Sequence, residues 1–130
     1  MMIPIISLEL IVEIHDNVID ISGGVNGVDI GRLAGSLARV EQQVFYNNIN
    51  DVFELACWYA VAIAKGRGFT DGNKRTALST MLTFLDIQGI TLVENSGLDD
   101  VMVSIVEGQL PHDILVKKLS YYIRHLIKEN

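Results

Sequence analysis

The sequence predicts an all-α fold, a single helical domain of about six helices over residues 1–130. Apolar residues recur at helical spacing in one segment after another, and only residues 90–93 have the character of an extended segment. A chain of 130 residues has the usual size of one domain. The hydrophobic fraction of 49% is enough for a well-buried interior, and no repeat, linker or low-complexity tract divides the chain.

The first helix is expected over residues 8–19, where apolar side chains follow helical spacing. Ser7 is placed to cap its start, and the pattern stops at Ser22-Gly23-Gly24. His15 falls on the apolar stripe of this helix. It is either a hydrogen-bonded histidine of the core or a polar side chain that supports a nearby site.

Two more helices are expected in the middle of the chain. Helical spacing resumes over residues 30–38 and is followed by the more polar residues 40–50, where the second helix ends in a loop. Asp51 then introduces residues 52–64, which are nearly all apolar. Such a segment is typical of a helix that is buried on every side, so we predict that it is the central helix of the domain.

The C-terminal half is expected to contain three helices. One begins near residues 71–73 and ends by Gly89, a second covers residues 98–107, and the last covers residues 115–126 after a proline. The extended segment of residues 90–93 lies between the first two.

Charge and composition argue against several classes of protein. The net charge of −6 repels phosphate backbones, so we expect no direct binding of nucleic acid. The longest apolar run, residues 52–64, is shorter than the roughly 20 residues that a membrane span needs. The N-terminus has no basic segment followed by a cleavage site, which predicts no signal peptide. Cys57 is the only cysteine and has apolar neighbours, which predicts a buried thiol and a cytoplasmic protein.

The loop of residues 66–75 concentrates features that a structural linker does not need. It precedes a helix whose first N–H groups lack partners and attract anions. Lys74 and Arg75 oppose the dipole of that helix, at about 0.3 to 1 kcal/mol each, unless a bound phosphate reverses the sign. Asp71 is either a hard oxygen ligand for Mg²⁺ beside the phosphate or only an N-cap. From the residues alone, a phosphate site and a capped, charged loop remain alternatives, and the spacing is not that of a P-loop.

A local group of cations runs against the acidic average of the chain and consists of Lys65, Arg67, Lys74 and Arg75. Such a group on an acidic protein indicates a specific anionic partner or a solvated helix end.

The same loop resembles the core motif of the Fic/Doc superfamily. The matching residues are Phe69, Asp71, Gly72, Asn73, Lys74 and Arg75. The run Asn73-Lys74-Arg75-Thr76-Ala77 resembles the Doc branch, because most Fic enzymes have glycine at the position of Lys74. Further matches extend over nearly the whole chain, at His15-Asp16, Gly23-Gly24, Gly31-Arg32 and the helix start at residues 51–53.

This resemblance implies a toxin of a toxin-antitoxin pair, which uses ATP and Mg²⁺ to phosphorylate a hydroxyl side chain of elongation factor Tu and so stops translation. It implies that Asp71 holds the metal and that Gly72, Asn73 and the following backbone amides bind the phosphate. It also implies that Lys74 and Arg75 contact the nucleotide phosphates. Lysine at this position favours a kinase over the AMP transfer of Fic relatives. A cognate antitoxin is expected to lay an amphipathic helix into a groove.

Arg67 departs from the family motif, which has a histidine two residues before the phenylalanine. In the family that histidine takes the proton from the attacking hydroxyl. A guanidinium cannot, and loss of a general base typically slows a reaction by about 10² to 10⁴. The arginine was made or selected to let cells survive the toxin, or it marks a pseudoenzyme that only binds, or another base such as His15 serves. We favour the first, because the motif around Arg67 is intact, and we expect transfer to suffer more than binding.

Overall fold

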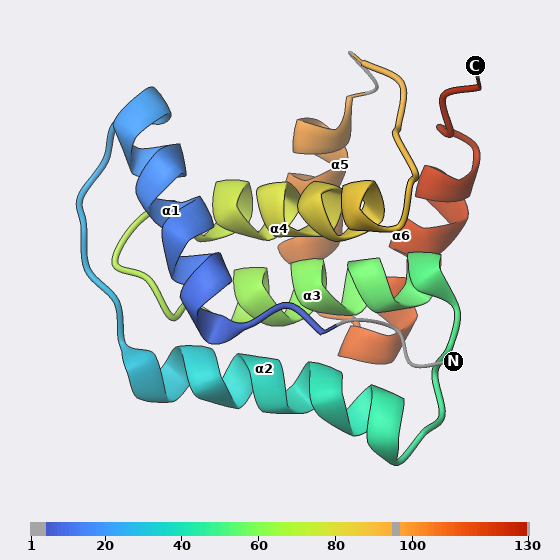
Figure 1. Cartoon of the computed structure of the whole chain (residues 1–130), viewed down its shortest axis with the longest axis horizontal. Coiled ribbons are helices and arrows are strands. Elements are labelled where there is room, and N and C mark those ends of the chain that lie inside the picture. The colour runs from blue at the N-terminus through green and yellow to red at the C-terminus, as the bar shows by residue number, and fades with distance from the viewer. Residues whose placement is uncertain (1–4, 95–96, 130) are drawn as a thin grey trace.

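The computed structural model describes residues 5–94 and 97–129, and this part of the chain folds into six helices (Figure 1). Their bounds are α1 Leu8–Ser22, α2 Ile30–Phe45, α3 Val52–Gly66, α4 Asn73–Ile87, α5 Leu98–Val106 and α6 His112–Arg124. The predicted all-α class is therefore confirmed. Extended pairing within the described residues is limited to isolated antiparallel bridges, Val28 with Phe69 and Leu92 with Ile127. None of the described helices combines the length and the apolar character that crossing a membrane requires.

Helix α3 lies at the centre of the molecule, as its apolar sequence predicts. Figure 1 shows α2 and α4 on opposite sides of it, while α6 also packs on α3 and α1 crosses α4. Every residue from Leu55 to Ala64 is buried. The hydroxyl oxygen of Tyr59 accepts a hydrogen bond from the backbone N–H of Ile6 at 2.8 Å, which ties the N-terminal segment to the core. Burial raises the pKa of Tyr59 to about 12. Cys57 is fully buried, as predicted.

The predicted capping residues start the helices where the sequence indicates. The Ser7 side chain accepts a hydrogen bond from the N–H of Leu10 at 3.1 Å, and Asp51 accepts one from the N–H of Glu54 at 3.0 Å. Each such cap stabilises a helix by about 1 kcal/mol. The last helix starts at His112, earlier than its apolar residues indicate, with Pro111 as its N-cap.

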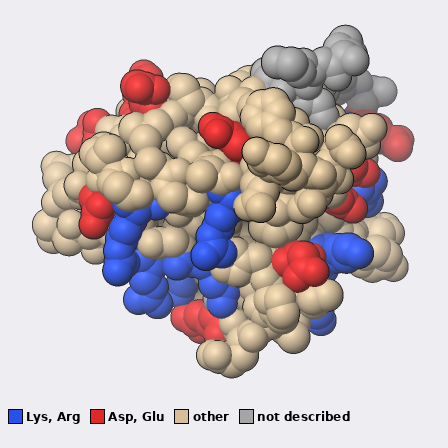
Figure 2. Space-filling view, turned by 90° about the horizontal axis from the view of Figure 1, so that it is seen from below, with Lys and Arg blue, Asp and Glu red and all other residues tan. Residues whose placement is uncertain are grey.

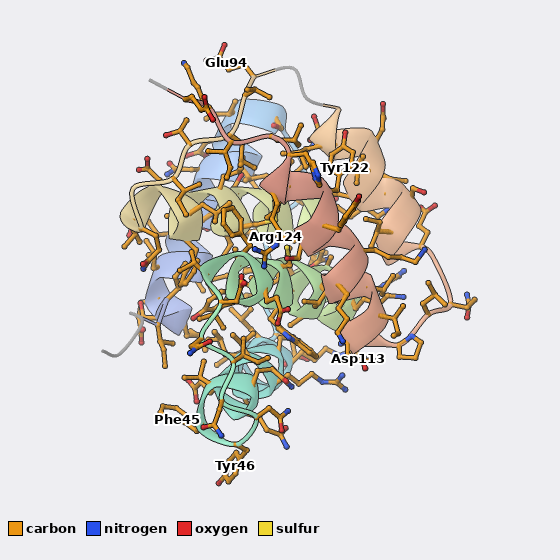
Figure 3. All side chains as sticks on the ribbon, turned by 90° about the vertical axis from the view of Figure 1, so that its right-hand side faces the viewer. Phe45, Tyr46, Glu94, Asp113, Tyr122 and Arg124 are labelled. Carbon is orange, nitrogen blue, oxygen red and sulfur yellow. The ribbon has the colours of Figure 1, made fainter. Side chains whose placement is uncertain are left out.

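An ion pair joins the start of α3 to the end of α6. The guanidinium of Arg124, which Figure 3 labels on α6, donates to the Asp51 carboxylate. It also lies over the ring of Phe53, 4.9 Å from its centroid. Partial burial raises the pKa of Asp51, but the hydrogen bonds from Arg124 and from the Glu54 amide outweigh it and bring that pKa below its ordinary value. The cap of the central helix is thus also a link between two helices.

Close packing of α2 fixes the end of α3 and the loop that follows. A Cβ atom on Gly66 would lie 2.0 Å from the hydroxyl oxygen of Ser36, and one on Gly68 would lie 3.2 Å from the Cα atom of Leu33. Glycine at both positions therefore favours the close approach of α2. The loop is held between α2 on one side and the end of α1 on the other.

Candidate functional site

Asn73, Phe69 and His15 hold the loop between α3 and α4 in a fixed path. The Asn73 side chain accepts a hydrogen bond from the N–H of Phe69 at 3.0 Å and donates one to its carbonyl at 2.8 Å. The Phe69 ring stacks on His15 with a centroid distance of 3.9 Å and an interplanar angle of 6°. His15 Nε2 lies 2.7 Å from the carbonyl oxygen of Asp71. Because a carbonyl only accepts, Nε2 carries the proton.

His15 therefore combines the two roles that the sequence left open. Its side chain is 2% exposed and hydrogen-bonded, as expected of a histidine in the core. The bond that it makes also holds the backbone of Asp71. His15 does not line the pocket described below, and its Nε2 is already bonded, so its position gives no support to His15 as a substitute base.

Asp71 is not the N-cap of α4, so that alternative is wrong. The N-cap is Gly72, in the left-handed conformation with φ 80°, and no side chain caps the helix. Asp71 accepts hydrogen bonds from the N–H of Gly72 at 2.9 Å and from the N–H of Val25 at 3.2 Å. A Cβ atom on Gly24 would lie 2.7 Å from the Asp71 carboxylate. The glycine therefore lets the chain after α1 reach this carboxylate.

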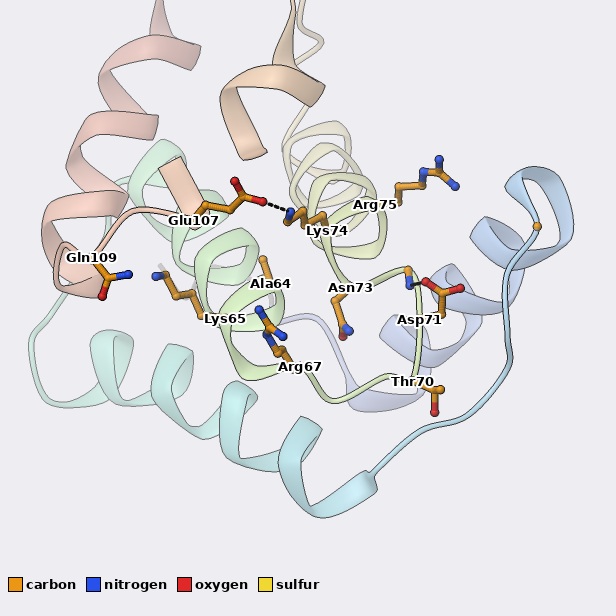
Figure 4. A pocket seen from close by; sticks show the side chains of 12 residues that line it. Ala64, Lys65, Arg67, Thr70, Asp71, Asn73, Lys74, Arg75, Glu107 and Gln109 are labelled. Atoms are coloured by element: carbon orange, nitrogen blue, oxygen red, sulfur yellow. Dashed lines mark hydrogen bonds and ion pairs between the residues drawn. The ribbon is translucent and has the colours of Figure 1, made fainter. Parts of the chain in front are cut away.

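A pocket of about 640 Å³ gathers the polar side chains of the loop and its neighbours (Figure 4). Its charged lining residues are Lys65, Arg67, Asp71, Lys74, Arg75 and Glu107. The sequence-predicted group of four cations is thus brought together in one place. Gly72 and Asn73 also line it. The first N–H groups of any helix lack intrahelical partners, and no side chain caps those of α4. Such a helix end, beside four cations, favours a bound anion.

The cations of the pocket differ in their partners. Within the described residues, Arg67 and Arg75 have no ion-pair or hydrogen-bond partner. Lys74 Nζ lies 2.8 Å from an oxygen of Glu107, the contact drawn as a dashed line in Figure 4. This hydrogen bond from Lys74 lowers the pKa of the exposed Glu107 carboxyl. Ion pairs exposed to solvent contribute little stability, so an anionic ligand can replace Glu107 as the partner of Lys74.

Arg67 follows the last residue of α3 in the left-handed conformation, with φ 51° and ψ 46°. A residue other than glycine pays roughly 1–2 kcal/mol for this conformation. Its side chain is exposed and lines the pocket. Arg67 occupies the position of the histidine in the family motif, and this position therefore faces the pocket.

Asp71 is suited to a metal ion that binds together with the phosphates of a substrate. In residues 5–94 and 97–129, no group of three or more His, Cys, Asp or Glu side chains could hold a metal ion. Mg²⁺ is commonly held by one or two carboxylates together with substrate phosphates and waters. The exposed Asp71 carboxylate beside an anion pocket fits that arrangement, whereas it does not fit a metal held by protein side chains alone.

Comparison with known proteins shows the family of this chain. Residues 5–85 match the family model described as Fic/DOC family, and the match includes the whole loop between α3 and α4. The chain belongs to the Fic/Doc family. It is also 39% identical, over 106 residues, to the "Protein kinase doc" of Escherichia phage P1. That similarity covers 81% of this chain and 84% of the phage protein.

Sequence reasoning on this Fic/Doc chain missed Glu107 and the amide of Val25. Glu107 lies 33 residues from its partner Lys74, and Val25 lies 46 residues from Asp71. No local pattern links residues so far apart. The glycine pair at Gly23-Gly24 was the available signal for the second contact, because Gly24 sits against the Asp71 carboxylate.

Proposed function

We propose that this chain is a protein kinase toxin of the Doc type, which transfers the γ-phosphoryl group of ATP to a hydroxyl side chain of a protein. One observation carries the proposal. Lys74, Arg75 and the uncapped start of α4 line the same pocket as Asp71. Similarity to a protein named as a kinase supports the same reaction. Phosphoryl transfer depends mainly on positioning and charge stabilisation, which such a pocket supplies.

Several residues of the pocket have distinct parts in this proposal. The nucleotide phosphates displace Glu107 from Lys74, and Arg75 grips two phosphate oxygens. Asp71 would hold Mg²⁺, which would supply positive charge against the phosphates. The amides of the first turn of α4, which follow Gly72, bind a phosphate, while the Asn73 side chain keeps the loop in place through Phe69.

Arg67 limits the transfer step in this proposal. The oxygen of the attacking hydroxyl forms a bond to the γ-phosphorus, the bond to the bridging oxygen breaks, ADP leaves, and the hydroxyl proton must pass to a base. A guanidinium cannot accept that proton. We expect Arg67 to slow transfer by about 10² to 10⁴ and to leave nucleotide binding largely intact.

The family resemblance supplies the target and the partner of this proposal. We take elongation factor Tu as the protein substrate, whose phosphorylation stops translation in the cytoplasm. A cognate antitoxin holds the domain by a helix in a groove. Labelling of purified elongation factor Tu tests the first assignment, and co-purification of the antitoxin tests the second.

The experiment compares the Arg67 chain with an Arg67→His variant on purified elongation factor Tu. Each is given ATP labelled at the γ-phosphate or, separately, at the α-phosphate. We expect γ-label on the target with Arg67→His and little with Arg67. α-Label would favour the AMP transfer of Fic relatives. Absence of any label with both proteins would contradict the enzyme proposal.

Arg67 itself favours a second candidate function, a catalytically inactive domain that binds nucleotide or antitoxin only. The pocket keeps its cations and its carboxylate although the residue at position 67 cannot act as a base. Under this candidate, Arg67→His stays inactive while ATP still binds and the antitoxin still co-purifies. The labelling experiment therefore separates the two functions.

A further inference from the structure

A second, smaller pocket adjoins the proposed nucleotide site. It has a volume of about 270 Å³, and its lining includes Arg32 and Arg39 of α2, Lys65 of α3 and His112 of α6. Lys65 also lines the larger pocket, so the two pockets are neighbours. Figure 2 shows Lys and Arg side chains gathered on one face of the molecule.

The two pockets together hold most of the positive charge of an acidic protein. Six of the ten Lys and Arg residues line one pocket or the other, against two of the sixteen Asp and Glu residues. Both of these carboxylates, Asp71 and Glu107, belong to the larger pocket. The smaller pocket has no carboxylate in its lining. The lining itself therefore contributes no negative charge, although Asp113 acts on His112 from outside it.

The cations of the smaller pocket retain free donors. Within the described residues, Arg32 has no side-chain partner. Arg39 donates to His112 Nδ1 at 3.3 Å, and Lys65 donates to the carbonyl of Gly108 at 2.7 Å. Each contact leaves further N–H donors on the same side chain, because a guanidinium has five and an ammonium has three.

His112 lines the same pocket and is a hydrogen-bond partner of Arg39. Partial burial, followed by the charges of Arg39 and Lys65, lowers the pKa of His112. Since Arg39 can only donate, His112 Nδ1 accepts and the proton of the neutral ring lies on Nε2. Residues that carry N–H donors thus line one small cavity from three helices.

We propose that this second pocket binds acidic side chains of the protein substrate, close to the hydroxyl that receives the phosphoryl group. The inference rests on the proposed kinase function, because a substrate chain must cross from one pocket to the other. Arginine pairs with a carboxylate through two parallel hydrogen bonds, and Arg32 and Arg39 have the free donors for such pairing. The site therefore selects hydroxyl residues that are flanked by Asp or Glu.

An acidic protein segment fits this surface better than a nucleic acid. The net charge of −6 repels a long polyanion beyond the patch, whereas a short acidic segment meets only the local positive charge. Proteins that bind single strands stack bases on aromatic side chains, and no Phe, Tyr or Trp lines this pocket.

The test measures the binding of two fluorescent peptides to the full chain by anisotropy. Both contain one threonine, which is flanked by about four glutamates in one peptide and by glutamines in the other. Two double variants lose the same positive charge, Arg32→Gln with Arg39→Gln and Lys118→Gln with Lys128→Gln. The second pair lies at exposed positions outside both pockets and serves as the matched control.

We expect the glutamate peptide to bind about tenfold more tightly than the glutamine peptide at low salt. The Arg32 and Arg39 variant should lose this preference, and the Lys118 and Lys128 variant should keep it. Equal binding of both peptides, or equal loss in both variants, would overturn the proposal. So would an oligonucleotide that binds more tightly than the glutamate peptide and depends on Arg32 and Arg39.

Titration of ATP against the same proteins separates this site from the nucleotide site. Unchanged ATP affinity in the Arg32 and Arg39 variant, with loss of the peptide preference, supports two distinct sites. If no protein binds ATP while the peptide preference persists, the acidic-segment site stands and the kinase function fails.

Discussion

Arg67 is unfavourable both for the backbone conformation of its position and for the base that transfer needs there. Its left-handed conformation is the one that closes α3 and turns the chain into the loop. Glycine adopts that conformation freely, whereas arginine does so at a cost. The exposed guanidinium makes no ion pair within the described residues, so it does not recover that cost through a contact.

Replacement of Arg67 by glycine should therefore stabilise the fold. We expect the free energy of unfolding to rise by about 0.4 to 1 kcal/mol, since the strain is removed without loss of a contact. Urea denaturation of the two proteins measures the difference. A lower unfolding free energy in Arg67→Gly would show that the arginine side chain does stabilise this turn.

Glu107 competes with phosphate for Lys74. Glu107→Gln removes the competing charge, so ATP should bind a few-fold more tightly than to the original chain. Glu41→Gln makes the same change of net charge at an exposed position outside the pocket and serves as the control. Calorimetric titration gives both affinities. The same affinity in both variants would mean that only net charge matters.

At the scale of elements, the starts of helices can be predicted from local sequence. The contacts that build the site cannot, because they join residues far apart in the chain. Ser7 and Asp51 cap the helices that they precede, because a cap bonds to an amide only three residues away. Asp71 was a possible cap by its sequence position, but the N-cap of α4 is Gly72 in the left-handed conformation. The bond from His15 to Asp71 spans 56 residues and was beyond any local pattern.

The link between α3 and α6 predicts a specific response to pH. Because the folded pKa of Asp51 is lowered, its stabilising effect is complete above about pH 4 and is lost as the pH falls through the lowered value. Asn also caps helices well, so Asp51→Asn removes mainly the charge. The variant should be less stable at pH 7 by up to about 1 kcal/mol.

Urea denaturation at several pH values below neutrality checks this prediction. The difference in unfolding free energy between the original chain and Asp51→Asn should shrink as the pH falls below about 4. A difference that stays constant with pH would exclude the ion pair with Arg124 as its cause.

The whole molecule separates its charges, with a net charge of −6 and a cationic face that includes both pockets. Composition alone indicates that phosphates are repelled, whereas the local group of cations and the helix start after the loop of residues 66–75 indicate the opposite. The single domain over residues 1–130 stays a prediction, which one cooperative unfolding transition would support.

Ionic strength should act differently on binding and on folding. Salt screens the exposed cations of the pocket, so ATP affinity should fall between about 0.05 M and about 0.5 M salt. The unfolding free energy should change much less, since it depends mainly on the buried apolar core around α3. An ATP affinity that is independent of salt would contradict the assignment of Lys74 and Arg75 to phosphate binding.

The most direct test of the nucleotide site is calorimetric titration of ATP, with and without Mg²⁺, against the original chain and an Asp71→Asn variant. Asn removes the charge at Asp71 and keeps the size of the side chain. ATP should bind the original chain more tightly when Mg²⁺ is present, and the variant should lose this gain while it still binds ATP. No ATP binding by the original chain, or the same gain from Mg²⁺ in both proteins, would contradict the account.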